Sequence, residues 1–480
     1  MKFLKQPRFY LLVMLTALLF YFTTRVSNLG VPFKFLALIV LVFLTILSLV
    51  VCLCYQKRRW IQILGVIITI LSGVGVYYGS TVFNDIYKTI SSLDDGANKS
   101  DKIVYSLILN QTYDADAGEV SPQLSELANK KFGVLEMGNT SYNRDIVASI
   151  REELGEHIGF DSIKNYTEAT QKLQSGEIEA LIINEAIRDV FEVDLNTIST
   201  VIKTYEFEEE KDVIRNPTKV TSEPFVVYIT GIDTYGGLGT TARSDVNKIG
   251  VINPLTKDIL LIDIPRDFYV PISCLYNEYD KLTHSGFYGP ECTVETMSNY
   301  MGLDINYYAR VNFSSVIQII DALNGIDVDS KFSFRIRTET GVYSFTEGIN
   351  HMNGEEALAF CRERYDLPGG DFDRIKNQTA VLKGAIKKMT SPAILSNYKE
   401  VLDVLVQNIE TNMPSEDIIA LINMQLSDMA TWNIESFSLR ANGTYDYSAM
   451  MGQELYMGIP DEDSIIEAKA LINEIMSRVY

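Results

Sequence analysis

Three apolar runs near the N-terminus constrain this chain more than any other feature. They span residues 9–24, 35–55 and 60–80. The second and third are about twenty residues long, enough to cross a hydrocarbon core about 30 Å thick. The first is shorter, but its ends carry the aromatic residues typical of a membrane interface. Because no small-x-small cleavage site follows it, we predict a retained helix rather than a signal peptide, and a three-helix membrane anchor over residues 1–80.

Lysine and arginine around these runs predict the orientation of the anchor. Six of them lie before the first run or between the second and third, and two lie between the first and second. Basic loops stay in the cytoplasm, so we expect a cytoplasmic N-terminus. Three crossings then make the chain a multi-pass protein of the cell membrane with extracellular C-terminal domains.

The charge of the remaining chain argues against one class of partner. The formal net charge is −20, yet residues 1–59 carry eight basic and no acidic side chains, which leaves about −28 on the rest. Proteins bind nucleic acid by neutralising phosphates with basic side chains. We therefore predict no nucleic-acid partner.

The outer part of the chain is predicted to hold two domains. Residues 81–100 are polar and turn-rich, which predicts a stalk. Residues 101–217 alternate strand-like runs with amphipathic helices in a βαβαβ-like order, typical of a small α/β accessory domain. A charged segment ending in proline places the next boundary near Thr218. For residues 218–480 we predict a three-layer α/β/α domain with its site at the strand ends, where loops converge.

The cysteines indicate no zinc site, because they show no CxxC spacing. Cys274 and Cys292 lie close together in one outer domain, where an oxidising compartment would allow a disulfide. The sequence leaves that pairing open. Cys361 has no obvious partner, and a buried small residue at the end of a helix explains it best.

Charged residues recur at successive loop edges of the second outer domain. The segment 361–374 adds arginines interleaved with aspartates around a Pro-Gly-Gly turn. Each cluster alone fits a solvated strand end or a salt-bridged loop, but their position at converging loops indicates a common site. The residues are Asp233, Arg243, Asp245, Arg266, Asp267, Lys281, Arg362, Arg364, Asp371 and Arg374.

An ordered series of segments resembles the LytR–CpsA–Psr family. The segments are ITGIDTYG, TARSDV, IPRDFYV, DKLTHS, GEEALAFCRER and GGDFDRIKNQ, across about residues 224–390. The membrane anchor and accessory module resemble the capsule branch of that family. Three positions depart from the pattern: Asp263 stands where serine is usual, Asp373 where glycine is usual, and Asn377 where arginine is common before Gln378.

The resemblance implies an extracytoplasmic phosphotransferase. Such an enzyme moves a capsular polysaccharide from a polyprenyl-pyrophosphate carrier onto peptidoglycan through a phosphodiester bond, assisted by Mg²⁺ or Mn²⁺. The carrier-linked polysaccharide, peptidoglycan and the membrane are then the expected partners. Capsule polymerase, export and tyrosine-kinase regulatory components extend that set.

The resemblance also assigns roles to residues. It implies that Asp233 and Asp245 bind the metal ion, and that Asp245 or Asp371 is the general base, with Arg266 as a further catalytic residue. The residues implied to hold the pyrophosphate are Arg243, Arg266, Lys281, Arg362, Arg364, Arg374 and Gln378. Lys281 would equally serve to order its own loop. Independently of any family, planar guanidinium groups match the non-bridging oxygens of a diphosphate better than ammonium groups do.

A lipid carrier requires an apolar sleeve, for which two apolar stripes are candidates. They comprise Val316, Ile317, Ile319, Ile320, Leu323, Val381, Leu382 and Ile386. Stripes at helical spacing also occur in an ordinary core, and the sequence does not separate the two.

Two other functions compete with the transferase. The chain would bind the lipid-linked glycan without catalysis and regulate capsule assembly or chain length, or it would control transcription. Topology and charge argue against direct DNA contact. A glycan-binding protein and a transferase both need the arginines, so the arginines do not separate these two functions. The glycan would be capsular polysaccharide, teichoic acid or another wall polymer.

Overall fold

The computed structural model of the chain describes most of residues 101–480. The described residues are 74, 88–92, 101–110, 124–136, 140–191, 194–209, 217–232 and 242–479. Apart from Val74, the three predicted membrane segments lie outside them and stay predictions. Within the described ranges, no helix is long and apolar enough to cross a membrane. The chain forms two compact units, Met1–Asp94 with Pro414–Ala430, and Asp95–Met413 with Thr431–Tyr480.

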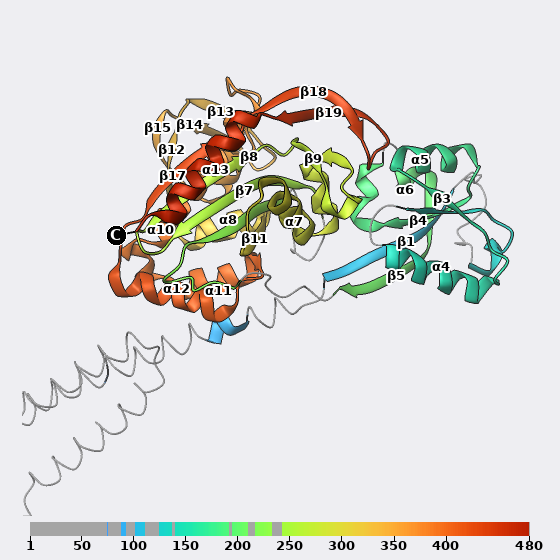
Figure 1. Ribbon diagram of the computed structural model, residues 1–480, viewed down its shortest axis with the longest axis horizontal. Coiled ribbons are helices and arrows are strands. Elements are labelled where there is room, and N and C mark those ends of the chain that lie inside the picture. The colour runs from blue at the N-terminus through green and yellow to red at the C-terminus, as the bar shows by residue number, and fades with distance from the viewer. Residues whose placement is uncertain are drawn as a thin grey trace, which may run out of the picture. The chain divides into compact units, whose positions relative to one another are not determined.

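The first unit includes helix α12 (Ser415–Asp428). The described part of the second unit contains two large sheets and four two-stranded ones (Figure 1). The predicted boundaries at residues 80, 100 and 217 stay predictions.

The first sheet of the second unit is mixed. Its described strands follow the order β3-β2-β4-β1-β5, in which β2 is parallel to β3 and β4, and β1 is antiparallel to β4 and β5. The elements are β1 (Asp101–Asn110), β2 (Phe132–Leu135), α4 (Thr140–Leu154), β3 (Phe160–Ile163), α5 (Tyr166–Ser175), β4 (Ala180–Asn184) and β5 (Ser199–Glu209). The run from β2 to β4 has the βαβαβ order that the sequence predicts.

The second sheet carries the candidate site. Its described strands follow the order β16-β11-β6-β7-β8-β17. The strands are β6 (Phe225–Ile232), β7 (Ser244–Asn253), β8 (Asp258–Ile264), β11 (Tyr307–Asn312), β16 (Glu410–Thr411) and β17 (Asn433–Ser438). Strand β8 is buried along its whole length, which explains its near-continuous apolar sequence.

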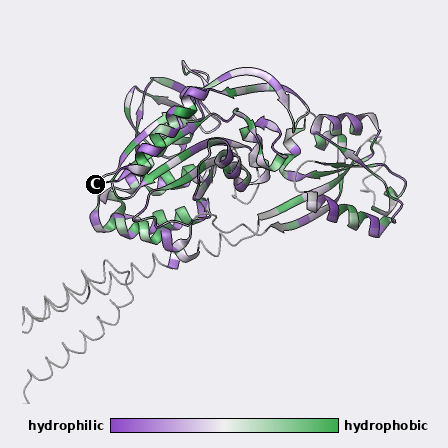
Figure 2. Cartoon of the chain, viewed as in Figure 1, coloured by the Kyte–Doolittle hydropathy of each residue, from purple (hydrophilic) through white to green (hydrophobic). Residues whose placement is uncertain are grey.

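Helices cover both faces of this second sheet. Neighbouring residues of a strand point to opposite faces. On β7, Ile249 joins a core cluster with helix α13, whereas Lys248 reaches Thr379 of helix α10 on the other face. The helices are α7 (Pro290–Met301), α8 (Phe313–Ala322), α9 (Gly354–Arg362), α10 (Asp371–Met389), α11 (Tyr398–Asn408) and α13 (Glu462–Ser477). Their mixed hydrophilic and hydrophobic residues fit helices with one face on a sheet (Figure 2). The layers are therefore helix, sheet and helix, as predicted for an α/β domain.

Four two-stranded antiparallel sheets belong to the same described region. They are β9 (Tyr269–Pro271) with β10 (Tyr279–Lys281), β12 (Ile326–Ser330) with β15 (Gly348–Met352), β13 (Phe334–Arg337) with β14 (Val342–Phe345), and β18 (Ala441–Ser448) with β19 (Gln453–Pro460). A disulfide joins Cys274 and Cys292, the pairing that the sequence left open.

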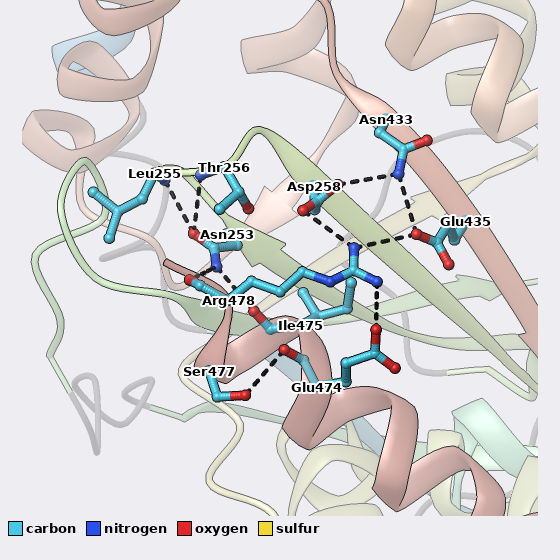
Figure 3. A network of polar contacts seen from close by, with 10 residues as sticks. All are labelled: Asn253, Leu255, Thr256, Asp258, Asn433, Glu435, Glu474, Ile475, Ser477 and Arg478. Atoms are coloured by element: carbon cyan, nitrogen blue, oxygen red, sulfur yellow. Dashed lines mark hydrogen bonds and ion pairs between the residues drawn. The ribbon is translucent and has the colours of Figure 1, made fainter. Parts of the chain in front are cut away.

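A polar network fastens the end of α13 to the sheet (Figure 3). The Arg478 guanidinium lies 3.2 Å from carboxylate oxygens of both Asp258 and Glu435, and 2.8 Å from Glu474. The Asn253 amide donates to the carbonyl oxygens of Ile475 and Arg478, each at 2.9 Å. The C-terminal segment is thereby held to the β7–β8 turn.

The two sheets of the second unit are joined through the turn between β18 and β19. The backbone N–H of Tyr166 donates to the Met450 carbonyl at 3.2 Å, and that of Thr167 to the Met451 carbonyl at 3.1 Å. Gly452 follows with φ +76°, and a Cβ there would lie 2.1 Å from Cγ of Asn165. A glycine is therefore required at this contact.

Candidate functional site

A cavity of about 570 Å³ lies between helix α10 and the second sheet. Its wall along α10 begins with Arg374 and Gln378 and continues with Val381, Leu382 and Met389. These positions span 15 residues, or about 22 Å of helix. The cavity thus has charged and polar groups toward the start of α10 and an apolar wall toward its end.

Strand order explains why Asp245 and Arg266 meet at this cavity. Asp245 lies at the start of β7, and Arg266 follows the end of β8. The two strands are antiparallel, so these ends share one edge of the sheet. The Arg266 Nη1 lies 3.1 Å from Oδ1 of Asp245, to which the Thr283 hydroxyl also donates at 3.0 Å. Both Asp245 and Arg266 line the cavity.

The Arg266 side chain is held by acidic neighbours. Burial by itself lowers its pKa, but Asp245, Asp267 and Asp371 outweigh that effect and raise the pKa above the ordinary value. Its buried Nε lies 4.0 Å from Asp267 Oδ2 and forms no hydrogen bond with any residue that the structure describes. One N–H of this guanidinium is therefore available to a ligand.

Arg374 brings a second guanidinium, from the first turn of α10. Its Nη2 forms an ion pair with Asp371 Oδ1 at 2.5 Å, whereas its buried Nε has no hydrogen-bond partner within the described part of the chain. Burial lowers the pKa of Arg374, and Arg266 and Arg364 lower it further against the opposing effect of Asp371 and Asp245. Two repelling cations with unfilled donors are typical of an anion site.

Three more predicted residues line the cavity. The Arg362 guanidinium lies 4.7 Å from the ring centroid of Phe313. Arg364 donates from Nη2 to the Tyr365 hydroxyl at 2.6 Å, and Gln378 donates from Nε2 to the Cys361 carbonyl at 3.4 Å. The structure therefore brings Arg266, Arg362, Arg364, Arg374 and Gln378 together with Asp245.

Three residues that the structure describes and that have predicted catalytic or pyrophosphate-binding roles do not line the cavity. Arg243 is exposed, and Lys281 lies 3.2 Å from Asp267. Asp371 contacts Arg374 and does not itself line the cavity. Asp233 lies outside the described residues. Their assigned roles stay predictions.

The apolar wall includes part of the predicted stripes. Val316, Ile319, Ile320, Val381 and Leu382 line the cavity, and Ile317, Leu323 and Ile386 do not. Leu323 is instead 2% exposed in the core cluster beneath. Residues of this wall that the sequence did not single out are Ile229, Ala309, Val311, Phe313, Leu358, Ala385, Met389, Leu405 and Ile409. The alternation of apolar Ala309 and Val311 with polar Arg310 and Asn312 in β11 was a usable sequence signal for Val311.

Lys248 also lines the cavity, although the sequence did not single it out. Its Nζ is 2.6 Å from Asp263 Oδ1 and 2.7 Å from the Thr379 hydroxyl, and both charged side chains are 2% exposed. Asp263, which stands where the family pattern has serine, is thus the ion-pair partner of Lys248. A lysine and an aspartate within two otherwise apolar strands were the available signal.

The other two departures also have structural reasons. Asp373 accepts from the backbone N–H of Gly369 at 2.8 Å and so fixes the turn that precedes α10. Asn377 is buried and donates to the Phe360 carbonyl at 3.3 Å, which ties α10 to α9. Neither side chain is among the residues that line this cavity.

Cys361 borders the cavity as a free thiol. Burial raises the pKa of this thiol to about 12, although nearby Lys248 acts in the opposite direction. The thiol therefore stays protonated at neutral pH and is a poor nucleophile.

The described residues contain only part of the predicted metal site. Among them, no group of three or more His, Cys, Asp or Glu side chains comes together. Asp245 supplies a hard carboxylate ligand of the kind that Mg²⁺ prefers, and its Oδ1 accepts from Arg266 and Thr283. This donor chemistry fits a cation that keeps several waters.

Much of this chain is similar to known proteins. Residues 192–467 match the profile of the LytR_cpsA_psr family. The polyisoprenyl-teichoic acid–peptidoglycan teichoic acid transferase TagU of Enterococcus faecalis is 34% identical over 220 residues, which cover 45% of this chain and 70% of the relative. TagU of Bacillus licheniformis is 30% identical over 260 residues, covering 53% and 79%. The crystal structure of Bacillus subtilis TagV matches with a TM-score of 0.46 and 27% identity, covering 54% and 99%.

Proposed function

The chain belongs to the LytR–CpsA–Psr family, and from this premise we propose that it transfers a glycopolymer from a polyprenyl-pyrophosphate carrier to peptidoglycan. We further propose that the polymer is capsular polysaccharide, that a phosphodiester links the product, and that the protein acts from the outer face of the cell membrane. The names of the relatives support transfer of a polymer to peptidoglycan, and the apolar runs of the sequence support the membrane location. The capsular substrate rests on the resemblance of the predicted anchor and accessory domain to the capsule branch of the family.

One observation carries the proposal: four arginines, three of them partly buried, share a single cavity with an apolar wall. A polyprenyl pyrophosphate has the same two parts, a concentrated negative charge and a hydrocarbon tail. Burial of that tail contributes about 0.8 kcal/mol per CH₂. A charge-assisted hydrogen bond to the diphosphate adds about 1.5–3 kcal/mol. The lengthwise change from polar to apolar along α10 matches that ligand.

The arginines would act on the reacting phosphate. Arg266 and Arg374 each have a buried Nε–H with no hydrogen-bond partner among the described residues, so a bound diphosphate would supply acceptors. Phosphoryl transfer depends mainly on positioning and on stabilising charge at the phosphate oxygens. Arg362 and Arg364 would add to that positive field. Asp371 would position Arg374 through their 2.5 Å contact.

Asp245 is the acidic residue of the described chain that lines this cavity. We propose that it holds Mg²⁺ or Mn²⁺ together with Asp233. Such an ion, when bound, neutralises charge on the phosphate oxygens. The general base that takes the proton of the acceptor hydroxyl remains Asp245 or Asp371, of which Asp245 lies at the cavity wall.

A transfer assay tests the proposal. The purified full-length chain is incubated with Mg²⁺, peptidoglycan oligomers and a pyrophosphoryl-lipid glycan, either capsular or of teichoic type, and mass spectrometry detects the covalent product. Arg374→Gln should slow transfer by about 10- to 150-fold, the equivalent of one charge-assisted contact. Arg335→Gln is the matched control, because Arg335 is exposed on β13 and does not line the cavity.

The outcomes separate the competing functions. If Asp245→Ala transfers as fast as the parent, the metal assignment is wrong. Lipid binding without transfer by the parent, with Mg²⁺ present, would support a carrier that regulates capsule assembly. Preference for one glycan donor decides between capsular polysaccharide and teichoic acid.

A further inference from the structure

Helix α10 borders a second cavity of about 580 Å³ on a different face. Lys376, Thr379, Lys383 and Lys387 of α10 line it, whereas Arg374 and Gln378 line the first cavity. The second cavity is completed by β12 and β17. One helix therefore separates the arginine-lined cavity from a cavity to which no role has been assigned.

Four lysines converge on this second cavity: Lys331, Lys376, Lys383 and Lys387. Lys376 pairs with Asp373 at 3.0 Å, and Lys383 donates to the Ser436 hydroxyl at 2.8 Å. Within the described part of the chain, Lys331, Lys383 and Lys387 form no ion pair. Such a concentration of lysines stands out in a chain whose net charge is −20.

The acidic residues of the cavity wall either have other partners or are exposed to solvent. Asp263 is buried and already accepts from Lys248, Thr379 and Ser438. Asp327 contacts the His351 ring at 2.8 Å, and Asp329 is exposed on the same strand. The lysines are therefore not neutralised within the wall.

The lysines also repel one another. Burial lowers the pKa of the Lys383 ammonium, and neighbouring Lys387 and Lys331 lower it further, while Asp263 and Glu435 oppose them. An anion bound among these side chains would relieve that repulsion. The cavity, the unpaired ammonium groups and their repulsion all favour a negatively charged ligand.

We propose that this cavity binds anionic groups of the glycopolymer, phosphodiester or carboxylate, away from the reacting pyrophosphate. The identity of the ligand as a glycopolymer rests on the proposed function. Lysine acts as a point charge and accepts either kind of anion. Lys376 and Lys387 are 11 residues apart, about 16 Å along α10, which suits an extended oligomer better than a single phosphate ion.

Binding of soluble oligomers to the full-length chain tests this site by calorimetry. The probes are a glycerol-phosphate oligomer, an oligogalacturonate and a neutral dextran oligomer, added after the arginine cavity has been saturated with geranyl pyrophosphate. Lys383→Gln should weaken binding of the charged oligomer about tenfold, as expected for one lost charge-assisted contact. Lys383→Arg should retain binding, and Lys387→Glu should weaken it at an exposed position without disturbing the core.

Lys388→Gln is the matched control, since Lys388 is on the same helix and does not line the cavity. Whichever charged oligomer binds identifies the source of the anion. Equal binding of dextran, or unchanged binding by both Lys383→Gln and Lys387→Glu, overturns the proposal.

Binding of geranyl pyrophosphate to the arginine-lined cavity is measured separately. If Arg374→Gln loses both ligands while the lysine variants keep both, the oligomer sits in the arginine cavity and this proposal fails while the proposed function stands. If geranyl pyrophosphate does not bind but the oligomer still requires Lys383, the lysine site stands and the proposed pyrophosphate site fails.

Discussion

The buried pair of Lys248 and Asp263 links the cavity wall to α10 at the scale of single residues. Asp263 also accepts from the hydroxyls of Thr379 and Ser438, so its oxygens are well satisfied. Removing one charge of such a pair leaves the other buried and unpaired, whereas removing both avoids that cost. The stability of this contact therefore depends on both partners being present.

Asp263→Asn should lower the free energy of unfolding by about 3–5 kcal/mol, because the Lys248 ammonium then lacks its counter-charge. The double change Lys248→Met with Asp263→Asn should recover most of that loss. Urea titrations of the parent, both single variants and the double variant measure the coupling. A double variant as unstable as Asp263→Asn alone would show that the pair is not the cause.

At the scale of elements, α10 matters most because both cavities border it. Its first turn is shaped by Asp373, whose carboxylate accepts from the Gly369 N–H, and a Cβ on Gly369 would lie 2.7 Å from that carboxylate. The acidic group also lies at the positive end of the helix dipole. Asp373 therefore holds the turn from which Arg374 projects.

Asp373→Ala should destabilise the protein by about 1 kcal/mol, the usual net contribution of one hydrogen bond, because the Gly369 N–H loses its acceptor. Lys376→Gln provides the control, because it removes only the 3.0 Å ion pair with Asp373, in which the lysine is 42% exposed. That change should cost at most about 0.5 kcal/mol. Thermal unfolding compares the two variants, and equal losses would assign the effect to the ion pair instead of the hydrogen bond to Gly369.

The same helix shows how far the sequence could predict the site. Its start, its arginine and its apolar stripe follow from local spacing, since side chains three or four apart share a face. Local spacing does not predict how a neighbouring helix is rotated about its own axis. It therefore does not predict which side chains of that helix face the cavity. That rotation brings Ile319 of α8 to the cavity wall but not Ile317, although both belong to the predicted stripe.

The second limit of the sequence-based prediction concerns contacts between residues that lie far apart in the chain. Strand order brings Asp245 and Arg266 to one edge, and the antiparallel turn between their strands was readable from the sequence. Lys281 has the same local signal of a charged loop, yet it contacts Asp267. The partner of a charged loop residue depends on tertiary contacts, which a single sequence does not encode locally.

At the scale of the whole molecule, Asp280 connects strand β10 to the turn between β18 and β19. That turn also contacts helix α5, which packs on the first sheet. Asp280 is fully buried, lies 2.7 Å from Nδ1 of His284, and accepts from the Ser448 hydroxyl and the Met450 N–H, each at 2.8 Å. Burial by itself raises its pKa, but the hydrogen bonds and the charge of His284 outweigh this and lower the pKa.

The lowered pKa predicts a stability loss in acid. In the pH range between the two pKa values the unfolded chain binds a proton that the folded chain does not, so stability rises with pH. The contribution of Asp280 is complete above the unfolded pKa of about 4 and is lost as pH falls through the folded value. Urea titrations from pH 2 to 7 should show a steeper acid loss for the parent than for Asp280→Asn. Parallel curves would exclude Asp280 as the source.

The contact between the two sheets of the second unit leads to the last prediction, in which two glycines serve as a matched pair. Gly452 and Gly176 have φ of +76° and +73°, so an alanine at either is strained by about 1 kcal/mol. They differ in surroundings: a Cβ at Gly452 would overlap Asn165, which caps α5, whereas a Cβ at Gly176 meets nothing within 4 Å.

Gly452→Ala should therefore displace α5 from the β18–β19 turn and expose the N–H groups of Tyr166 and Thr167, which bond to Met450 and Met451. Hydrogen exchange measured on the peptide that covers the start of α5 should become faster in Gly452→Ala and remain near the parent rate in Gly176→Ala. Because both variants carry the same backbone strain, faster exchange in both would trace to that strain, and only a difference between them assigns the effect to the contact between the two sheets.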